Sequence, residues 1–204
     1  MTAEQTLEEE PRPPERPKLA PLPLTFPEPP LSDGVVTLRG LRDDDAEAVQ
    51  RACSVPITQQ WLDFLPRPYE LSHAQWFIER ARSDWQTGHA AVFAIADAND
   101  DALLGAVAIQ AGRLHRPFVG YWVGPWARGR GTASRAVGLV SAWAVRTLDT
   151  VRLELFVEVG NTASERTAEK AGFHREGVMR AYGDGLGGPI DLVMFSLLPA
   201  DLDR

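Results

Sequence analysis

A short glycine-rich stretch with two arginines contains the residue types best suited to ligand chemistry. It runs from Arg128 to Ala133, between a strand-like apolar segment and a segment with helical spacing. Gly129 and Gly131 lack Cβ atoms, so the backbone there can turn tightly and approach a ligand. Free N–H groups at the start of a helix, together with the helix dipole, attract negative charge. The stretch therefore predicts a site for a diphosphate or another anion, to which Arg128 and Arg130 add positive charge.

Two common phosphate-binding patterns do not account for this stretch. The chain has no G-x-x-x-x-G-K-[ST] sequence, which excludes a P-loop. The pair Gly129-x-Gly131 lacks the third glycine of the dinucleotide fingerprint, and the next strand does not end in the expected acidic residue. A tight turn with two solvated arginines is the alternative that the stretch alone leaves open.

Two runs along the chain resemble the signatures of the GNAT superfamily of N-acetyltransferases. Arg128-x-x-Gly131-x-Ala133 is similar to the acyl-CoA pyrophosphate signature [QR]-x-x-G-x-[GA]. The run from Asn161 to Phe173 is similar to N-x-x-S-x-R-x-x-E-K-x-G-F, the form of the second signature in the RimJ/RimL-like branch. The gap between the two runs also matches, and the resemblance covers residues 33–198.

The resemblance implies acetyl-CoA, or another acyl-CoA, as cosubstrate, with no metal ion. A strand ending at Val123 would splay from its neighbour, and the N–H of Trp122 or Val123 would polarise the thioester carbonyl. Asn161 would bind the pantetheine side of the donor, and Ser164 would face the departing sulfur. The diphosphate would be held by the backbone amides of Arg128, Gly129, Arg130, Gly131, Thr132 and Ala133.

The resemblance also implies direct transfer of the acyl group to a primary amine, but two template residues are missing. Many members carry a tyrosine seven residues after the asparagine, where this chain has Ala168, so Ser164 is the substitute hydroxyl. One branch carries a glutamate five residues before the asparagine, where this chain has Phe156. The bases considered are Glu158, Asp184, an ordered water, and His115, for which a surface position is the simpler interpretation.

Simpler roles compete with these assignments. Helix capping would explain Asn161, and Thr162 with Glu165 has the spacing of a capping box. Ser164 could be an ordinary serine at a helix start. The alternative functions are a non-catalytic acyl-CoA-binding or regulatory module, and an enzyme that uses succinyl-CoA with help from Arg113 or Arg116.

Periodicity predicts a mixed α/β domain. Strand–helix alternation in the middle implies some parallel pairing, and hairpins on either side imply a largely antiparallel sheet. The resemblance implies a central sheet of about seven strands that is splayed in the middle and has helices on both faces. Ser72 and Gln75 have capping-box spacing, and residues 182–189 are expected to form a loop. The expected strands are residues 35–39, 91–96, 103–110, 118–123, 152–159, 173–179 and 190–197; the expected helices are residues 43–52, 72–87, 131–147 and 162–171.

Residues 1–30 are expected to form a disordered or extended arm beside a folded domain of residues 31–204. They hold nine of the sixteen prolines, and proline cannot join the interior of a helix or sheet. A solvated tail is the favoured interpretation, and a partner-binding segment is the alternative.

Composition limits the location and the partners. A net charge of −7 with no basic stripe argues against nucleic-acid binding. The single cysteine, Cys53, suits a reducing compartment, and neither an export signal nor a membrane span is evident, so a cytoplasmic protein is expected. The acceptor is expected to be a small-molecule or protein amine, and a homodimer is one open alternative. Core packing is favoured over a substrate pocket for Trp61, Phe64, Tyr69, Trp76 and Trp85.

Overall fold

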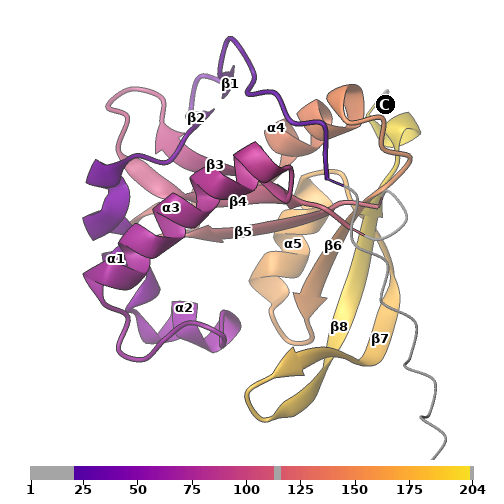
Figure 1. Cartoon of the computed structure of the whole chain (residues 1–204). Helices are drawn as coiled ribbons and strands as arrows, with labels where there is room; N and C mark the ends of the chain where they lie inside the picture. Colours follow the sequence, from indigo (N-terminus) through magenta and orange to yellow (C-terminus); the bar gives the residue numbers. More distant parts are fainter. Residues whose placement is uncertain (1–20, 113–115, 203–204) are drawn as a thin grey trace, which may run out of the picture.

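The computed structural model describes residues 21–112 and 116–202, and the strands in these ranges form one mixed sheet (Figure 1). The order across the sheet is β1-β2-β3-β4-β5-β6-β8-β7. Neighbouring strands are antiparallel except β5 and β6, which are parallel because helix α4 connects them. The strands are β1 (Leu31–Ser32), β2 (Val36–Arg39), β3 (Ala90–Asp97), β4 (Leu103–Gln110), β5 (Phe118–Val123), β6 (Leu153–Glu158), β7 (His174–Gly185) and β8 (Gly188–Leu197).

The prediction of a mixed, largely antiparallel sheet with helices on both faces is confirmed. The described residues contain eight strands rather than about seven, because the two-residue β1 adds an edge beside β2. The helices are α1 (Ala46–Cys53), α2 (Pro56–Trp61), α3 (Leu71–Thr87), α4 (Thr132–Thr147) and α5 (Thr162–Lys170), with 3-10 turns at Asp43–Asp45, Pro125–Ala127 and Pro199–Asp201.

Two hydrophobic cores hold the helices against opposite faces of the sheet (Figure 1). The side chains of β3 contribute alternately to the two cores, because successive side chains of a strand point to opposite faces of the sheet. Ala91, Phe93 and Ile95 pack with α4 and α5, while Val92 and Ala94 pack with α1 and α3. Phe93 is fully buried, and burial of such a side chain stabilises the fold by about 1.5–3 kcal/mol.

The described part of the proline-rich segment, residues 21–30, lies on the domain without helix or strand. It is not simply solvated, because Leu22, Leu24 and Phe26 are partly buried and pack against the core that includes α4. Phe26 lies with its ring centroid 5.0 Å from that of Trp85 and 5.5 Å from that of Phe93. Apolar residues between the prolines explain this packing. Residues 1–20 lie outside the described residues.

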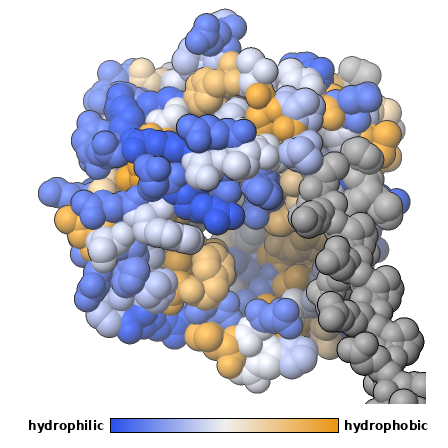
Figure 2. Space-filling view, viewed as in Figure 1, coloured by the Kyte–Doolittle hydropathy of each residue, from blue (hydrophilic) through white to orange (hydrophobic). Residues whose placement is uncertain are grey.

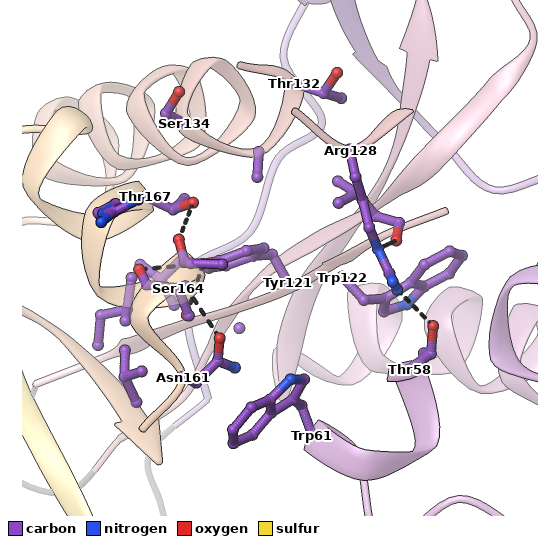
Figure 3. A pocket seen from close by; sticks show the side chains of 18 of the residues that line it. Thr58, Trp61, Tyr121, Trp122, Arg128, Thr132, Ser134, Asn161, Ser164 and Thr167 are labelled. Atoms are coloured by element: carbon purple, nitrogen blue, oxygen red, sulfur yellow. Dashed lines mark hydrogen bonds between the residues drawn. The ribbon is translucent and has the colours of Figure 1, made fainter. Parts of the chain in front are cut away.

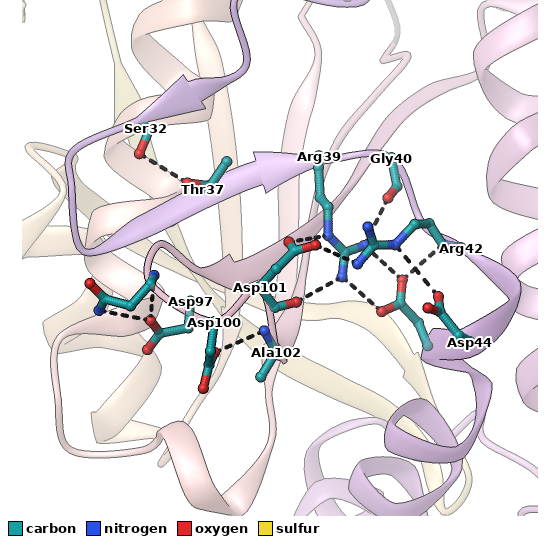
Figure 4. A network of polar contacts seen from close by, with 12 residues as sticks. Ser32, Thr37, Arg39, Gly40, Arg42, Asp44, Asp97, Asp100, Asp101 and Ala102 are labelled. Atoms are coloured by element: carbon teal, nitrogen blue, oxygen red, sulfur yellow. Dashed lines mark hydrogen bonds and ion pairs between the residues drawn. The ribbon is translucent and has the colours of Figure 1, made fainter.

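An ion-pair network fixes the start of α1 to the sheet (Figure 4). The Arg39 guanidinium donates to both carboxylate oxygens of Asp45, at 2.8 and 2.9 Å, and its Nε donates to Asp101 at 2.7 Å. Arg42 donates to the second oxygen of Asp101 at 2.6 Å. Asp45 therefore does more than suit a helix N-terminus, because it ties that terminus to β2 and, through Arg39, to the turn between β3 and β4.

Several local predictions were wrong. Helix α2 was not expected, and its only clear signal is Pro56 at its first position. Helix α3 is capped by Glu70 and His73 rather than by Ser72 and Gln75, because it begins one residue earlier than predicted.

The caps and turns nearer the C-terminus agree with prediction only in part. The capping role considered for Asn161 is confirmed, because its side chain accepts a hydrogen bond from the N–H of Ser164, whereas Thr162 and Glu165 do not form the expected capping box. Residues 182–189 are mostly strand, since β7 and β8 continue into a tight hairpin with register pairs out to Gly185 and Gly188.

Within the described ranges, no helix has the length and apolar character needed to cross a membrane.

Ser141 on α4 generates a stability prediction. Its side chain is fully buried, and its Oγ is the one buried side-chain N or O atom of the described residues without a hydrogen-bond partner. Because an unpaired buried polar group costs about 1–3 kcal/mol, we expect Ser141→Ala to raise the free energy of unfolding by about 1 kcal/mol. Urea denaturation measures this. The matched control is Ser83→Ala on the exposed side of α3, where only a few tenths of a kcal/mol from helix propensity are expected. A gain no larger than that of the control would contradict the prediction.

Candidate active site

The strands β5 and β6 separate in the middle of the sheet. They pair at only two positions, Phe118 with Glu154 and Val119 with Leu155. Beyond Val119, β5 still pairs with β4 and β6 still pairs with β8, so each keeps one free edge. These edges leave backbone N–H and C=O groups available to a ligand, as the predicted splay requires.

Strand alternation decides which backbone groups of β5 face this gap. The N–H of Gly124 donates to Leu104 on the β4 side, and Pro117 accepts from Glu154 on the β6 side. Because successive residues of a strand alternate direction, Tyr121 and Val123 direct their N–H groups toward β6. The sequence left Trp122 and Val123 as alternative donors. The structure puts the Trp122 N–H in the ladder with β4, so Val123 is the available donor.

The predicted anion loop follows β5 and ends at the N-terminus of α4. Gly129 and Gly131 have φ angles of +74° and +79°, a left-handed conformation that glycine adopts without strain. Gly131 is the N-cap of α4, and no side chain in the described part of the chain caps that end of the helix. Among the described residues, no protein atom accepts a hydrogen bond from the backbone N–H groups of residues 129–134. Of the amides that the sequence predicted to hold a diphosphate, those of residues 129–133 are thus unblocked, whereas the Arg128 N–H donates to the Pro125 carbonyl at 3.4 Å.

The two arginine side chains of the loop do not converge on these amides. Arg128 donates from its guanidinium to the Thr58 hydroxyl at 2.7 Å and from Nε to the Val123 carbonyl at 3.4 Å. It therefore joins the loop to α2. Burial lowers the pKa of Arg128, and no carboxylate of the described residues pairs with it. Arg130 is exposed and does not line the cavity.

Helix α5 forms the opposite wall. The Asn161 side-chain oxygen caps the helix by accepting from the Ser164 N–H at 3.1 Å, while its amide N–H groups have no acceptor in the described chain. The Ser164 hydroxyl lies 2.7 Å from the phenol oxygen of Tyr121, which reaches it from β5 (Figure 3). Arg166 and Lys170, one turn apart on α5, also line the space and have no ion-pair partner in the described residues.

These walls enclose an open cavity of about 600 Å³. Figure 2 shows the molecular surface hollowed between the part formed by α2 and the part formed by the later strands. Of the predicted site residues, the cavity is lined by Trp122, Val123, Arg128, Gly129, Gly131, Thr132, Ala133, Glu158, Asn161 and Ser164. It is also lined by residues of α2, namely Ile57, Thr58 and Trp61, and by the following Leu62.

The candidate bases differ in whether their side chains line the cavity. Glu158, at the end of β6, is half-buried, lines the cavity, and has no side-chain partner in the described residues. Asp184 is exposed on the β7–β8 hairpin and is not among the cavity residues. His115 and Arg113 lie outside the described residues, and Arg116 does not line the cavity.

Aromatic side chains occupy the end of the cavity away from α4. Phe156 lines it and is stacked on Tyr182 of β7, with ring centroids 5.7 Å apart. Trp61 also lines the cavity, so the favoured core interpretation was wrong for this residue. The same interpretation holds for Tyr69 and Trp85, which pack in the cores, and fails for Phe64 and Trp76, which are 75% and 67% exposed.

The hairpin and the segment after α2 meet beside this aromatic end. The Asp63 carboxylate accepts a hydrogen bond from the Leu186 N–H at 2.7 Å, which joins the segment to the hairpin tip. This hydrogen bond connects two segments that are 123 positions apart in the sequence.

This geometry suits acyl transfer from a thioester. One end offers unpaired amides at a helix N-terminus, the middle offers free strand edges, and the far end offers a carboxylate and a hydroxyl. The matching family model, described as an acetyltransferase (GNAT) domain, covers residues 36–174, more than half of the chain. The chain therefore belongs to the GNAT acetyltransferase family, which places it among acyl-CoA-dependent N-acyltransferases.

Comparison with individual proteins supports this family. The chain is 41% identical over 91 residues to "Probable N-acetyltransferase YjcK" of Bacillus subtilis (strain 168), an alignment that covers 43% of this chain. The chain spans half of the length of that relative.

Two solved structures share the fold. Mycobacterium smegmatis RimJ in complex with CoA-disulfide has a TM-score of 0.71 at 23% identity, covering 84% of this chain and 85% of that one. The ribosomal L7/L12 alpha-N-protein acetyltransferase RimL in complex with coenzyme A has a TM-score of 0.71 at 21% identity, covering 83% and 96%.

Sequence reasoning missed three parts of the site. Tyr121 was assigned only to a strand, because its contact with Ser164 joins residues 43 positions apart. Thr58 was missed with α2 itself, while Trp61 of the same helix was assigned to the core. Arg166 and Lys170 appeared in the second signature, where their four-residue spacing on a helix was the available signal that they share one face.

Proposed function

We propose that this protein transfers an acetyl or other short acyl group from acyl-CoA to a primary amine by direct attack on the thioester. The observation that carries the proposal is the run of unpaired amides from residue 129 to residue 134, which opens on the same cavity as the free edges of β5 and β6. Anions are stabilised at such helix N-termini by the free N–H groups and the dipole.

The donor fits the cavity in one direction. Its diphosphate lies against the amides of the loop, with Arg166 and Lys170 available for its negative charge. Its pantetheine arm follows the free edge of β5, and the thioester carbonyl accepts from the Val123 N–H. One such backbone donor, placed where negative charge develops on the carbonyl oxygen, stabilises the transition state by about 3 kcal/mol.

The amine must lose a proton, because only a neutral amine attacks the thioester. A free α-amino group has a pKa of about 8 and a lysine about 10.4, so a nearby base assists at neutral pH. Glu158 is the carboxylate that lines the cavity, and it accepts this proton directly or through a water. Ser164, on the other wall, donates a hydrogen bond to the departing sulfur.

The acceptor is a cationic amine, in our proposal the N-terminus of a protein. Glu158 is the only acidic residue lining the described cavity, and it attracts such a group, while Trp61 and Phe156 provide apolar contact. The similarity of fold to an alpha-N-protein acetyltransferase supports this acceptor class. We propose a cytoplasmic location, because acyl-CoA donors are formed there, and a catalytic domain of residues 31–204 beside an N-terminal arm.

The amide loop gives a binding prediction. Gly131→Val strains the backbone at a φ of +79° and places a side chain beside the free N–H groups. We expect acetyl-CoA affinity to fall by about tenfold or more, because each hydrogen bond to a charged group contributes about 1.5–3 kcal/mol. Isothermal titration calorimetry measures the affinity.

The matched control for this change is Gly34→Val. Gly34 has a φ of +82° and open space around its missing Cβ, but it lies in the β1–β2 turn. Both variants should lose about 1–2 kcal/mol of stability from strain, and only Gly131→Val should lose the donor. Equal affinities in both variants would refute the assignment of the loop.

The transfer itself is tested by mixing acetyl-CoA, succinyl-CoA and other short acyl-CoA donors with peptide N-termini, amino acids and polyamines. Thiol release above the hydrolysis rate, with mass spectrometry of the acylated amine, is the expected outcome for at least one pair. A protein that binds acyl-CoA without acylating any amine would be a binding module, and the proposal would fail.

Glu158 gives a prediction for the chemical step. We expect Glu158→Gln to lower kcat/KM by about a hundredfold, in the range typical of a lost general base. Asp184→Asn, outside the cavity, should keep kcat/KM within about twofold. If Asp184→Asn lowers kcat/KM by about a hundredfold and Glu158→Gln leaves it within about twofold, the base lies on the hairpin instead.

A further inference from the structure

The Tyr121 side chain forms a contact that the expected mechanism does not use. Its phenol oxygen lies 2.7 Å from Ser164 Oγ. The same oxygen lies 3.5 Å from the Ser164 carbonyl oxygen, a distance at which a hydrogen bond is weak. Both residues line the cavity, one from β5 and the other from α5 (Figure 3). Burial raises the pKa of Tyr121, so its hydroxyl keeps its proton at neutral pH.

A tyrosine cannot reach this point from the helix position where the family template has one. That position is Ala168, which is fully buried and packs in the core with Leu155 and Phe173. A large side chain there would have to enter a close-packed interior, which has little free volume. In this chain the phenol that contacts Ser164 belongs instead to Tyr121 of strand β5.

The hydrogen bonds among Thr167, Tyr121 and Ser164 limit how their hydroxyl protons can be arranged. Thr167 contacts the Tyr121 hydroxyl, and its own proton can go either to the Ala163 carbonyl, 3.0 Å from its Oγ1, or to the phenol oxygen. When Thr167 donates to the phenol and Tyr121 donates to Ser164 Oγ, the Ser164 proton is left to point into the cavity. Each hydroxyl has one proton and two acceptor lone pairs, so this arrangement uses one donor and one acceptor at each contact.

We propose that Tyr121 is a positioning residue that holds the Ser164 hydroxyl with its proton toward the leaving sulfur of the donor. This inference rests on the proposed transfer function. The amine nitrogen forms the new bond to the carbonyl carbon, and the C–S bond breaks with its electron pair on sulfur. The developing thiolate accepts a hydrogen bond from Ser164, and it ends as a thiol with the proton that the amine released. Ser164 and Tyr121 keep their protons throughout.

The Tyr121 phenol prevents the Ser164 hydroxyl from forming a competing hydrogen bond. A serine in the first turn of a helix readily donates to a nearby backbone carbonyl, an alternative that would turn its proton away from the ligand. Removal of the Tyr121 hydroxyl should release Ser164 to such a local bond. The expected signature is a slower chemical step with unchanged donor binding, because the contact with sulfur grows only as charge develops there.

The test compares Tyr121→Phe, Ser164→Ala and the double variant for kcat, acetyl-CoA KM and acetyl-CoA dissociation constant. We expect Ser164→Ala to lower kcat by about a hundredfold and Tyr121→Phe by about tenfold, each with acetyl-CoA affinity within about threefold. The double variant should be no slower than Ser164→Ala, because the phenol acts only through the serine. Additive losses would show that Tyr121 does not act through Ser164 and would overturn the proposal.

The matched control is Tyr69→Phe, which also removes a buried tyrosine hydroxyl, one that bonds to Cys53 outside the cavity. It should leave kcat and KM unchanged, and thermal melts show whether either variant is destabilised. An equal loss of kcat in Tyr69→Phe would assign the effect to stability and overturn the positioning role.

A crystal structure of the CoA complex decides the question independently of turnover. We expect the CoA sulfur within hydrogen-bond distance of Ser164 Oγ in the wild type, and a rotated Ser164 hydroxyl in Tyr121→Phe. A sulfur beyond the reach of Ser164 would overturn the positioning role even if transfer is observed. CoA bound in this pose without turnover of any amine would instead refute the transfer function and leave the Tyr121–Ser164 geometry intact.

Discussion

The early end of the β5–β6 pairing is the constraint on which the rest of the site depends. A parallel pair that continued beyond Val119 would satisfy the N–H and C=O groups of Tyr121 and Val123 with protein atoms and leave no edge for a ligand. Because β5 and β6 are each held on their other side, by β4 and β8, the separation does not leave either strand unsupported. The cost of two half-paired strands in the centre of a sheet is offset by the two hydrophobic cores, which fix α4 and α5 on one face and α1 and α3 on the other.

The separation also determines the electrostatics of the cavity. Helices α4 and α5 both begin beside the gap, so the positive ends of two helix dipoles lie near it. Arg128, Arg166 and Lys170 line the same space, and among the described lining residues only Glu158 opposes them. An anionic donor is therefore favoured along most of the cavity. The carboxylate is confined to the end of β6, where our proposal places the incoming amine.

The sequence predicted what local rules determine. Alternation and helical spacing located the main strands and helices, and Gly129 and Gly131 identified the loop because a left-handed backbone before a helix calls for glycine. It failed where the outcome depends on contacts distant in sequence. Six residues of α2 are too few for a periodic signal, and nothing local says that Arg128 will donate to Thr58, 70 positions away. Glu158 and Asp184 were both candidate bases in the sequence, and the structure places Glu158 in the cavity and Asp184 outside it on the β7–β8 hairpin.

The substitutions relative to the family template make physical sense when positions in space are compared instead of positions in sequence. Ala168 is buried and helps α5 pack closely on the sheet, which a phenol at that position would prevent. Close packing brings Ser164 within 2.7 Å of Tyr121, so the same packing that removes one hydroxyl supplies another. Phe156, where one branch has a carboxylate, stacks on Tyr182 and supports the wall of the cavity, while Glu158 lies two residues further along the same face of β6. A thioester requires a donor at its oxygen, a donor at its sulfur and a base at the amine, and in our proposal these groups come from β5, α5 and β6.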